Sequence, residues 1–154
     1  MSTTDVTTNI KTLVAASAGL PDTYDDDPTT GYPSLTFTTV SEVIDIGEIA
    51  KAFEVVNHQT VDRDYPQKLK DTYDIANIAI NLGRVSSDAG QALLESALAL
   101  KQCYSFKITL ASGDIIYFTA QVIKYGVGSI AAGAVETSMM ELAVSPESLF
   151  TEIV

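Results

Sequence analysis

The sequence FEVVNHQTVDRDYPQKLKDTYDIANIAINL spans residues 53–82, and the rest of the chain is organised around it. Its two ends are rich in β-branched, aromatic and aliphatic residues, and residues 72–82 alternate with a period of two, which predicts a strand at each end. Residues 62–71 between them are charged and contain Pro66. This segment is longer than the roughly two to five residues of most hairpin loops. We therefore expect a long charged loop that is either a contact surface or simply solvated.

The composition indicates one domain with a substantial core. The chain has 154 residues, of which 46% are hydrophobic and 19% are charged, and the charged share is below the roughly 25% of ordinary soluble domains. No apolar run approaches the roughly 18 residues that a membrane-spanning helix needs. The low charge is expected if other subunits cover much of the surface, or if serine and threonine supply the surface polarity.

The net charge of −11 limits the partners. Phosphate binding depends on lysine and arginine, so an electrostatic nucleic-acid binder and a protein of anionic membrane surfaces are both disfavoured. An acidic wall repels DNA and lets it slide past without binding. The single cysteine, Cys103, excludes an intrachain disulfide, and the first residues show no secretory signal, so we expect folding in a reducing cytoplasm.

The chain divides into a flexible N-terminal arm at residues 1–32, a β-domain at residues 33–145 and a C-terminal tail at residues 146–154. Within the N-terminal part, residues 21–32 form a loop that carries three consecutive aspartates, Asp25–Asp27. Adjacent carboxylates are ligands for a hard cation. No EF-hand spacing follows them, so a solvated acidic loop is the favoured interpretation.

The β-domain contains several strands and one helix. Asp88 and Gln91 match a capping box, which predicts a helix that begins there and ends near residues 100–102. Glycine and proline punctuate the strand patterns. The predicted strands are residues 33–40, 41–49 with a bulge at Gly47, 53–61, 72–82, 103–111, 115–124 and 135–144. This order predicts a mainly β fold, an antiparallel β-sandwich or short barrel with one flanking α-helix.

The sequence offers no catalytic set, so we expect a protein that is not an enzyme and uses no cofactor or metal. His58, the only histidine, lies on a predicted strand between polar neighbours and is more typical of a surface residue than of a general base. Cys103 has no histidine near it in sequence, and a nucleophile needs an activating partner. Motifs of the GxSxG, P-loop, HExxH and CxxC types are absent.

The order of these stretches resembles the tail tube proteins of long-tailed bacteriophages, particularly the lambda-like class with non-contractile tails. The resemblance covers about residues 33–145 and depends on order and spacing. Its elements are Ile46–Ile49, the strand Phe53–Asn57 that is similar to the family's VxxT segment, Asp62–Tyr65, Leu69–Asp71, the DxxQ helix start at Asp88–Gln91, the hairpin from Phe106–Ile108 to Tyr117–Ala120, and the last strand. Gln67 and Lys68 stand where the family often has a glycine.

The resemblance implies a structural subunit of the virion tail, made in the host cytoplasm. Six copies would form a ring, and stacked rings would form a hollow tube. DNA would pass through its lumen without tight binding, and no membrane would be a partner. It also implies partners such as a tape measure, an initiator and a terminator protein. The charged loop suits contacts between rings, where ion pairs fix register more than affinity. The candidate contact residues are Asp62, Arg63, Asp64, Tyr65, Lys68, Lys70 and Asp71.

Two alternatives stay open. The inner tube of a contractile injection or secretion system shares the same fold, and the sequence shows no sheath. A monomeric β-sandwich binding module would instead use the long loop and Asp25–Asp27 to hold a ligand or Ca²⁺.

Overall fold

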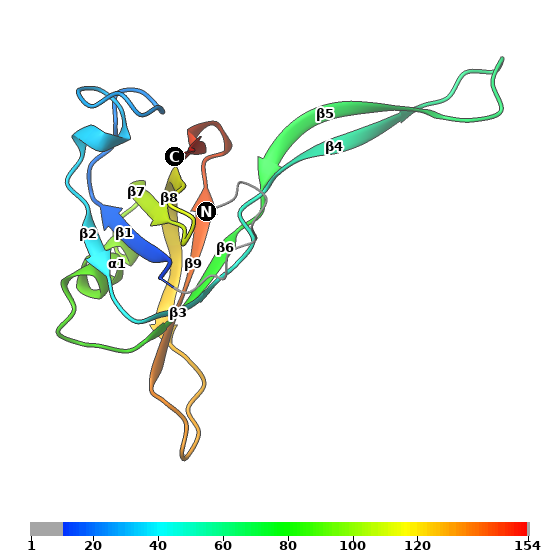
Figure 1. Cartoon of the computed structure of the whole chain (residues 1–154). Coiled ribbons are helices and arrows are strands. Elements are labelled where there is room, and N and C mark those ends of the chain that lie inside the picture. The colour runs from blue at the N-terminus through cyan, green and yellow to red at the C-terminus, as the bar shows by residue number, and fades with distance from the viewer. Residues whose placement is uncertain (1–10, 154) are drawn as a thin grey trace.

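The computed structural model describes residues 11–153 and is mainly β with one α-helix and two short 3₁₀ helices (Figure 1). The strands are β1 (Leu13–Ser17), β2 (Thr38–Val40), β3 (Val43–Ile46), β4 (Lys51–His58), β5 (Gln67–Ile75), β6 (Ile78–Gly83), β7 (Tyr104–Thr109), β8 (Ile115–Val127), β9 (Thr137–Val144) and β10 (Phe150–Glu152). The helices are η1 (Tyr32–Ser34), α1 (Ala89–Leu98) and η2 (Pro146–Ser148). The predicted fold class, mainly antiparallel β with one helix, is confirmed.

Most strands belong to one antiparallel sheet in the order β2-β1-β7-β8-β9-β6-β3, and β10 pairs with the start of β8. The two end strands, β2 and β3, are separated in the chain only by Ser41 and Glu42. The sheet must therefore curl until its two edges approach each other. The result is a short barrel that is open between β2 and β3.

The core fills the inside of this curled sheet. The inward faces of β6, β8 and β9 carry alternate apolar residues, as their sequence patterns predict. The fully buried side chains include Ile78, Ile80, Leu82, Phe106, Phe118, Met140 and Leu142. The Phe106 and Phe118 rings stack with their centres 5.3 Å apart. These residues hold β6, β7, β8 and β9 together as one body.

Helix α1 covers part of the sheet and contacts β8, β2 and β1. Leu94 and Ala97 on its inner face are buried. At Gly90 a Cβ atom would collide with the backbone of Thr39 in β2. A glycine is therefore required for the first turn of the helix to lie this close to β2.

Several boundaries differ from the sequence predictions. β1 lies inside the sheet, although the sequence predicts a flexible segment at residues 1–32, and β10 lies in the predicted C-terminal tail. Residues 1–10 of that N-terminal segment lie outside the described residues. β5 begins at Gln67, so Lys68, Lys70 and Asp71 belong to a strand and the intervening loop is only residues 59–66. The alternation that predicts strands is missing from residues 67–71 because both faces of β5 are exposed.

Candidate assembly surface

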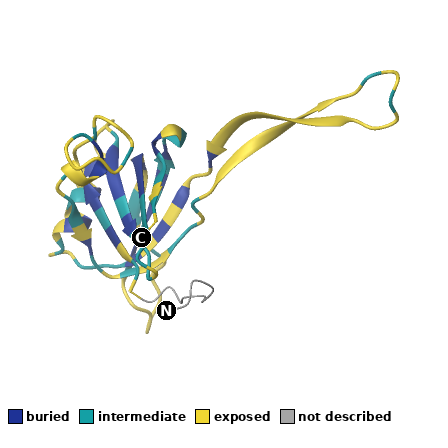
Figure 2. Cartoon of the chain, turned by 45° about the horizontal axis from the view of Figure 1, so that its top comes forward, coloured by how far each residue is buried: buried dark blue, intermediate teal, exposed yellow. Residues whose placement is uncertain are grey.

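Strands β4 and β5 pair only with each other and project from the barrel as a long ribbon, which we call the arm (residues 51–75) (Figure 1). The arm is inserted between β3 and β6, which are paired neighbours in the main sheet. Every residue of its two strands is exposed except Ile75 (Figure 2). An isolated two-stranded ribbon is at best marginally stable in water, which makes the arm a candidate contact surface.

One side of the arm, the lysine face, combines aromatic and cationic side chains. Phe53 lies opposite Tyr73 with their ring centres 5.4 Å apart. Lys70 Nζ lies 4.9 Å from the centre of the Phe53 ring, and Lys51 Nζ lies 4.7 Å from that of Tyr73. With the alternation of strand residues, these contacts assign Lys51, Phe53, Val55, Lys68, Lys70 and Tyr73 to this face. The residues assigned to it by the register include three lysines and no acidic residue.

The opposite side, the acidic face, carries Ala52, Glu54, Val56, His58, Leu69 and Asp74. Val56 lies directly opposite Leu69. A register shift between Phe53 and Val55 marks a β-bulge there. Apolar side chains are exposed on both faces, with 59% exposure for Val55 and 46% for Val56. The apolar side chains of either face would therefore be removed from water only if a partner covered that face.

The loop at the end of the arm is organised around Arg63. Its Nε donates to Thr60 Oγ1 at 2.9 Å, its Nη1 donates to Gln67 Oε1 at 3.0 Å, and its carbonyl oxygen accepts from Gln59 Nε2 at 2.7 Å. The Thr60 hydroxyl also donates to the Asp62 carboxylate. Arg63 thus shapes the loop, whereas Tyr65 is 63% exposed.

The structure does not gather the seven candidate contact residues into one cluster. Asp62, Arg63, Asp64 and Tyr65 lie in the end loop, while Lys68, Lys70 and Asp71 lie along β5. Sequence reasoning missed the β4 side of the arm, where Lys51, Phe53 and Val55 are exposed. Phe53 and Val55 resemble ordinary strand residues, so the sequence carries no signal of their exposure.

Charge is divided unevenly between the arm and the barrel. The arm contains four of the nine basic residues and five of the twenty acidic residues of the chain. It is therefore almost neutral, and nearly all of the net charge of −11 lies on the rest of the chain. The lysine face is therefore opposite in charge to the acidic rest of the chain.

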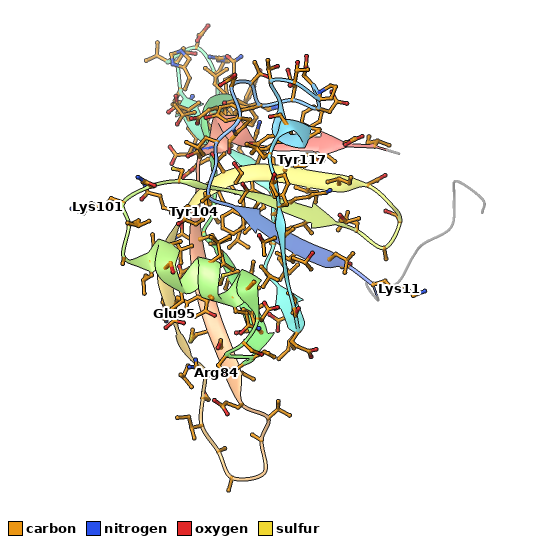
Figure 3. The ribbon with its side chains drawn as sticks, turned by 90° about the vertical axis from the view of Figure 1, so that its left-hand side faces the viewer. Lys11, Arg84, Glu95, Lys101, Tyr104 and Tyr117 are labelled. Atoms are coloured by element: carbon orange, nitrogen blue, oxygen red, sulfur yellow. The ribbon has the colours of Figure 1, made fainter. Side chains whose placement is uncertain are left out.

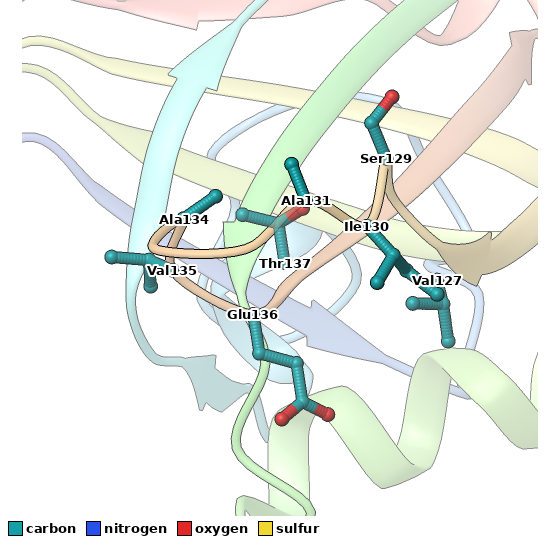
Figure 4. A pocket seen from close by; sticks show the side chains of 8 residues that line it. All are labelled: Val127, Ser129, Ile130, Ala131, Ala134, Val135, Glu136 and Thr137. Carbon is teal, nitrogen blue, oxygen red and sulfur yellow. The ribbon is translucent and has the colours of Figure 1, made fainter.

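A second apolar protrusion, which we call the tip (residues 128–136), joins β8 to β9 at the end of the barrel opposite the arm (Figure 1). Ile130 is 89% exposed and Val135 is 76% exposed. A hollow of about 230 Å³ is lined by Val127, Ser129, Ile130, Ala131, Ala134, Val135, Glu136 and Thr137 (Figure 4). At the base of the tip, Arg84 Nε lies 3.2 Å from Glu136 Oε1.

Asp88 and Gln91 link the helix to the open side of the barrel. The Asp88 carboxylate accepts from Gln91 N at 3.0 Å and from Ser41 Oγ at 2.8 Å, so Asp88 is the N-cap. The buried Gln91 side chain donates to Ser41 O at 3.1 Å and Gly83 O at 2.9 Å, and accepts from Val85 N at 3.1 Å. These bonds fasten the turn between β2 and β3 to the end of β6.

The role of Gln91 goes beyond the predicted capping box, in which its side chain would reach back to the N-cap. The signal in the sequence is its position three residues before Leu94, on the buried side of α1. Partial burial favours the neutral form of Asp88, but the hydrogen bonds from Gln91, Ser41 and Gly90 outweigh this effect and lower the pKa of the carboxyl.

Two of the three aspartates of the N-terminal loop, Asp25 and Asp27, form hydrogen bonds within its turns. Asp25 Oδ1 accepts from Thr23 Oγ1 at 2.8 Å and from Asp27 N at 3.1 Å. Hydrogen bonds from the backbone and side chain of Thr29 lower the pKa of Asp27. Among residues 11–153 no group of three potential metal ligands lies close together.

The two residues considered for catalysis, His58 and Cys103, lie in different parts of the structure. His58 is exposed near the outer end of β4, and Cys103 is a half-buried free thiol. Within the described part of the chain, no helix combines the length and hydrophobicity needed to cross a membrane.

Comparison with known proteins identifies the fold. No family model and no curated protein sequence matches the chain. Solved structures that match include a sheath/tube terminator structure of the extracellular contractile injection system PVC in its extended state, with a TM-score of 0.70, 8% identity and coverage of 99% of this chain and 100% of that one.

Two further matches come from tails. The tail of an empty gene transfer agent particle, refined with C6 symmetry, has a TM-score of 0.67 and 11% identity, covering 96% of this chain and 100% of that one. The SPP1 tail tube has a TM-score of 0.64 and 11% identity, covering 92% and 76%. The chain therefore has the fold of tail tube proteins.

Proposed function

We propose that this chain is a structural tube subunit of a viral tail, in which hexameric rings stack into a hollow tube that conducts DNA during ejection. The lambda-like, non-contractile class is the subtype that its order of elements favours. The tail-tube fold and the C6 symmetry of the gene transfer agent tail support the proposal. The chain would be made in the host cytoplasm and would end in the virion tail, in contact with initiator, terminator and tape measure proteins.

The observation that carries the proposal is the exposed arm. A ribbon that exposes apolar residues on both faces needs a partner. A second copy supplies one in a self-assembling tube, and a repeated contact between different surfaces of identical subunits continues into rings or filaments. Contacts between rings then involve Asp62, Arg63, Asp64, Tyr65, Lys68, Lys70 and Asp71, some through the end loop and some through β5.

A surface suited to the lumen lies on the outer side of β3, β6 and β9. On β6 the outward side chains are small or polar, and Ala79 and Asn81 are exposed there. Asn81 Nδ2 donates to Asp45 Oδ1 at 2.8 Å, and Asn77 Nδ2 donates to Glu141 Oε1 at 3.3 Å. A surface with these two carboxylates would repel the DNA backbone and let DNA slide.

The inner tube of a contractile injection system is the second candidate. The match to the PVC sheath/tube terminator structure favours it, because the similarity extends over the full length of both chains. Electron microscopy of particles from the source would separate the candidates. A sheath around the tube identifies a contractile system, and a bare tube identifies the non-contractile class.

The first test is negative-stain electron microscopy of the concentrated protein at neutral pH, combined with light scattering. Hollow filaments with a regular ring repeat are the expected result. A monomer at all concentrations whose unfolding temperature rises with Ca²⁺ would replace the tube by a calcium-binding module.

A further inference from the structure

We infer that the tip of one copy receives the lysine face of the arm of a second copy. This inference rests on the proposed function, because it supposes that copies of the chain associate. It adds the place on the barrel where the arm binds and the face of the arm that binds there. The partner is a second copy of this chain, and the contact joins two different surfaces.

The tip has the chemistry of a receiving surface. Ile130 and Val135 are largely exposed, and Val127 is exposed beside them around the 230 Å³ hollow (Figure 4). Apolar side chains gathered on one protrusion mark an interaction site more than scattered ones do. The hollow is open to the side chains of a partner.

Acidic residues lie next to this apolar surface. Glu136 at the base of the tip has a side chain that is 72% exposed, and it forms a surface ion pair with Arg84, a type of ion pair that contributes little to stability. Glu95 is exposed on α1, on the same side of the barrel as Arg84 (Figure 3). A partner with apolar and cationic groups therefore suits this end of the molecule.

The lysine face has both kinds of group. Phe53, Val55 and Tyr73 supply apolar and aromatic area, and Lys51 and Lys70 lie over the aromatic rings. The acidic face also has apolar residues, but Glu54 and Asp74 on it would meet Glu136 and Glu95 with like charge. Charge complementarity therefore selects the lysine face.

The positions of the two surfaces also fit. The arm and the tip lie at opposite ends of the barrel, so an arm cannot reach the tip of its own chain (Figure 1). A contact between opposite ends of identical copies is head to tail, and it can be repeated from copy to copy. Each copy then gives one arm and receives another.

Disulfide cross-linking tests the inference. The variant Val55→Cys/Ile130→Cys/Cys103→Ser places one thiol on the lysine face and one on the tip. Under mild oxidation of the concentrated protein we expect a ladder of covalent dimers, trimers and longer chains on a non-reducing gel. The matched control is Val56→Cys/Ile130→Cys/Cys103→Ser, because Val56 is adjacent to Val55 but lies on the acidic face. We expect no ladder beyond dimers from the control.

The outcomes separate this inference from the proposed function. A missing ladder, or an equal ladder from the control, would overturn the inference even if the wild-type protein forms hollow filaments. A ladder specific to Val55 in a protein that forms no hollow filaments would support the contact and count against the tube.

A charge exchange provides the second measurement. Lys51→Glu/Lys70→Glu should raise the concentration needed for association roughly tenfold, since it places like charges in the contact. Adding Glu95→Lys/Glu136→Lys should restore association at least in part. Association that is unaffected by the first change, or is not restored by the second, would contradict the inference.

Discussion

The arm and the barrel are both antiparallel β structure, but they differ in what surrounds their strands. In β9 every second residue is buried, and its buried side chains pack against β6 and β8. In β4 no residue is buried, although Phe53, Val55 and Val56 are as apolar as core residues. The comparison shows that apolar sequence alone does not create a core. The strands of the barrel bury one another's apolar side chains, whereas those of the arm leave theirs exposed.

The largest test of this difference is Phe118→Ala. Phe118 is fully buried and stacks on Phe106, so the substitution removes packed area and leaves a cavity. We expect the free energy of unfolding to fall by about 3–5 kcal/mol, measured by denaturant titration of the monomer. A loss below about 1 kcal/mol would show that the barrel is not the stabilising unit.

Gln91→Ala tests how the barrel is closed. The substitution leaves Ser41 O, Gly83 O and Val85 N without their side-chain partner. Groups left unsatisfied in this way cost about 1–3 kcal/mol, so we expect a loss of about 2 kcal/mol in the same titration. The exposed Glu95→Gln on the same helix is the control and should change stability by less than about 0.5 kcal/mol. Equal effects of the two substitutions would refute the role of Gln91.

Asp88→Ala tests how the N-cap contributes to the stability of the barrel and how that contribution depends on pH. Loss of the N-cap should cost about 1 kcal/mol at pH 7. The pKa of Asp88 in the folded protein is lowered from 3.8, so its charge contributes fully above that value and the contribution is lost as the pH falls through the folded pKa. We therefore expect the difference in stability between wild type and variant to be constant above the unfolded pKa of 3.8 and to narrow as the pH falls below it. A gap that widens toward acid pH would contradict this sign.

The smallest expected effect is that of Phe53→Ala on the monomer. Phe53 is 43% exposed, and its ring contacts Tyr73 and Lys70, which are both residues of the arm. The free energy of unfolding should change by less than about 0.5 kcal/mol. Light scattering of the concentrated protein should nevertheless show weaker association. A loss of stability near that of Phe118→Ala would mean that the arm is part of the core.

Strong local patterns explain what the sequence predicted. The hairpin of β7 and β8 places an apolar residue at every second position of both strands around the turn at Ser112–Asp114, and the structure pairs Phe106 with Phe118 as that pattern requires. The helix start at Asp88 is encoded in four residues. Such signals need no knowledge of the rest of the chain.

The missed features depend on distant parts of the molecule. The short segment Leu13–Ser17 has weak periodicity, and only its pairing with β7 and β2 makes it a strand. The arm is hidden for the opposite reason, since strands exposed on both faces have no inside to impose a period. The contribution of Gln91 to closure depends on Ser41 and Gly83, which are far from it in sequence or outside its helix.

The position of β1 in the sheet has a consequence for the order of events during synthesis. Ala16 pairs with Phe106, so β1 remains incompletely paired until the chain has been translated past β7. Native contacts between such distant residues are formed slowly. The arm, in contrast, is completed at residue 75, well before the barrel. Each nascent chain thus exposes the apolar residues of the arm before its core is complete, and exposed apolar surface on incompletely folded chains favours aggregation.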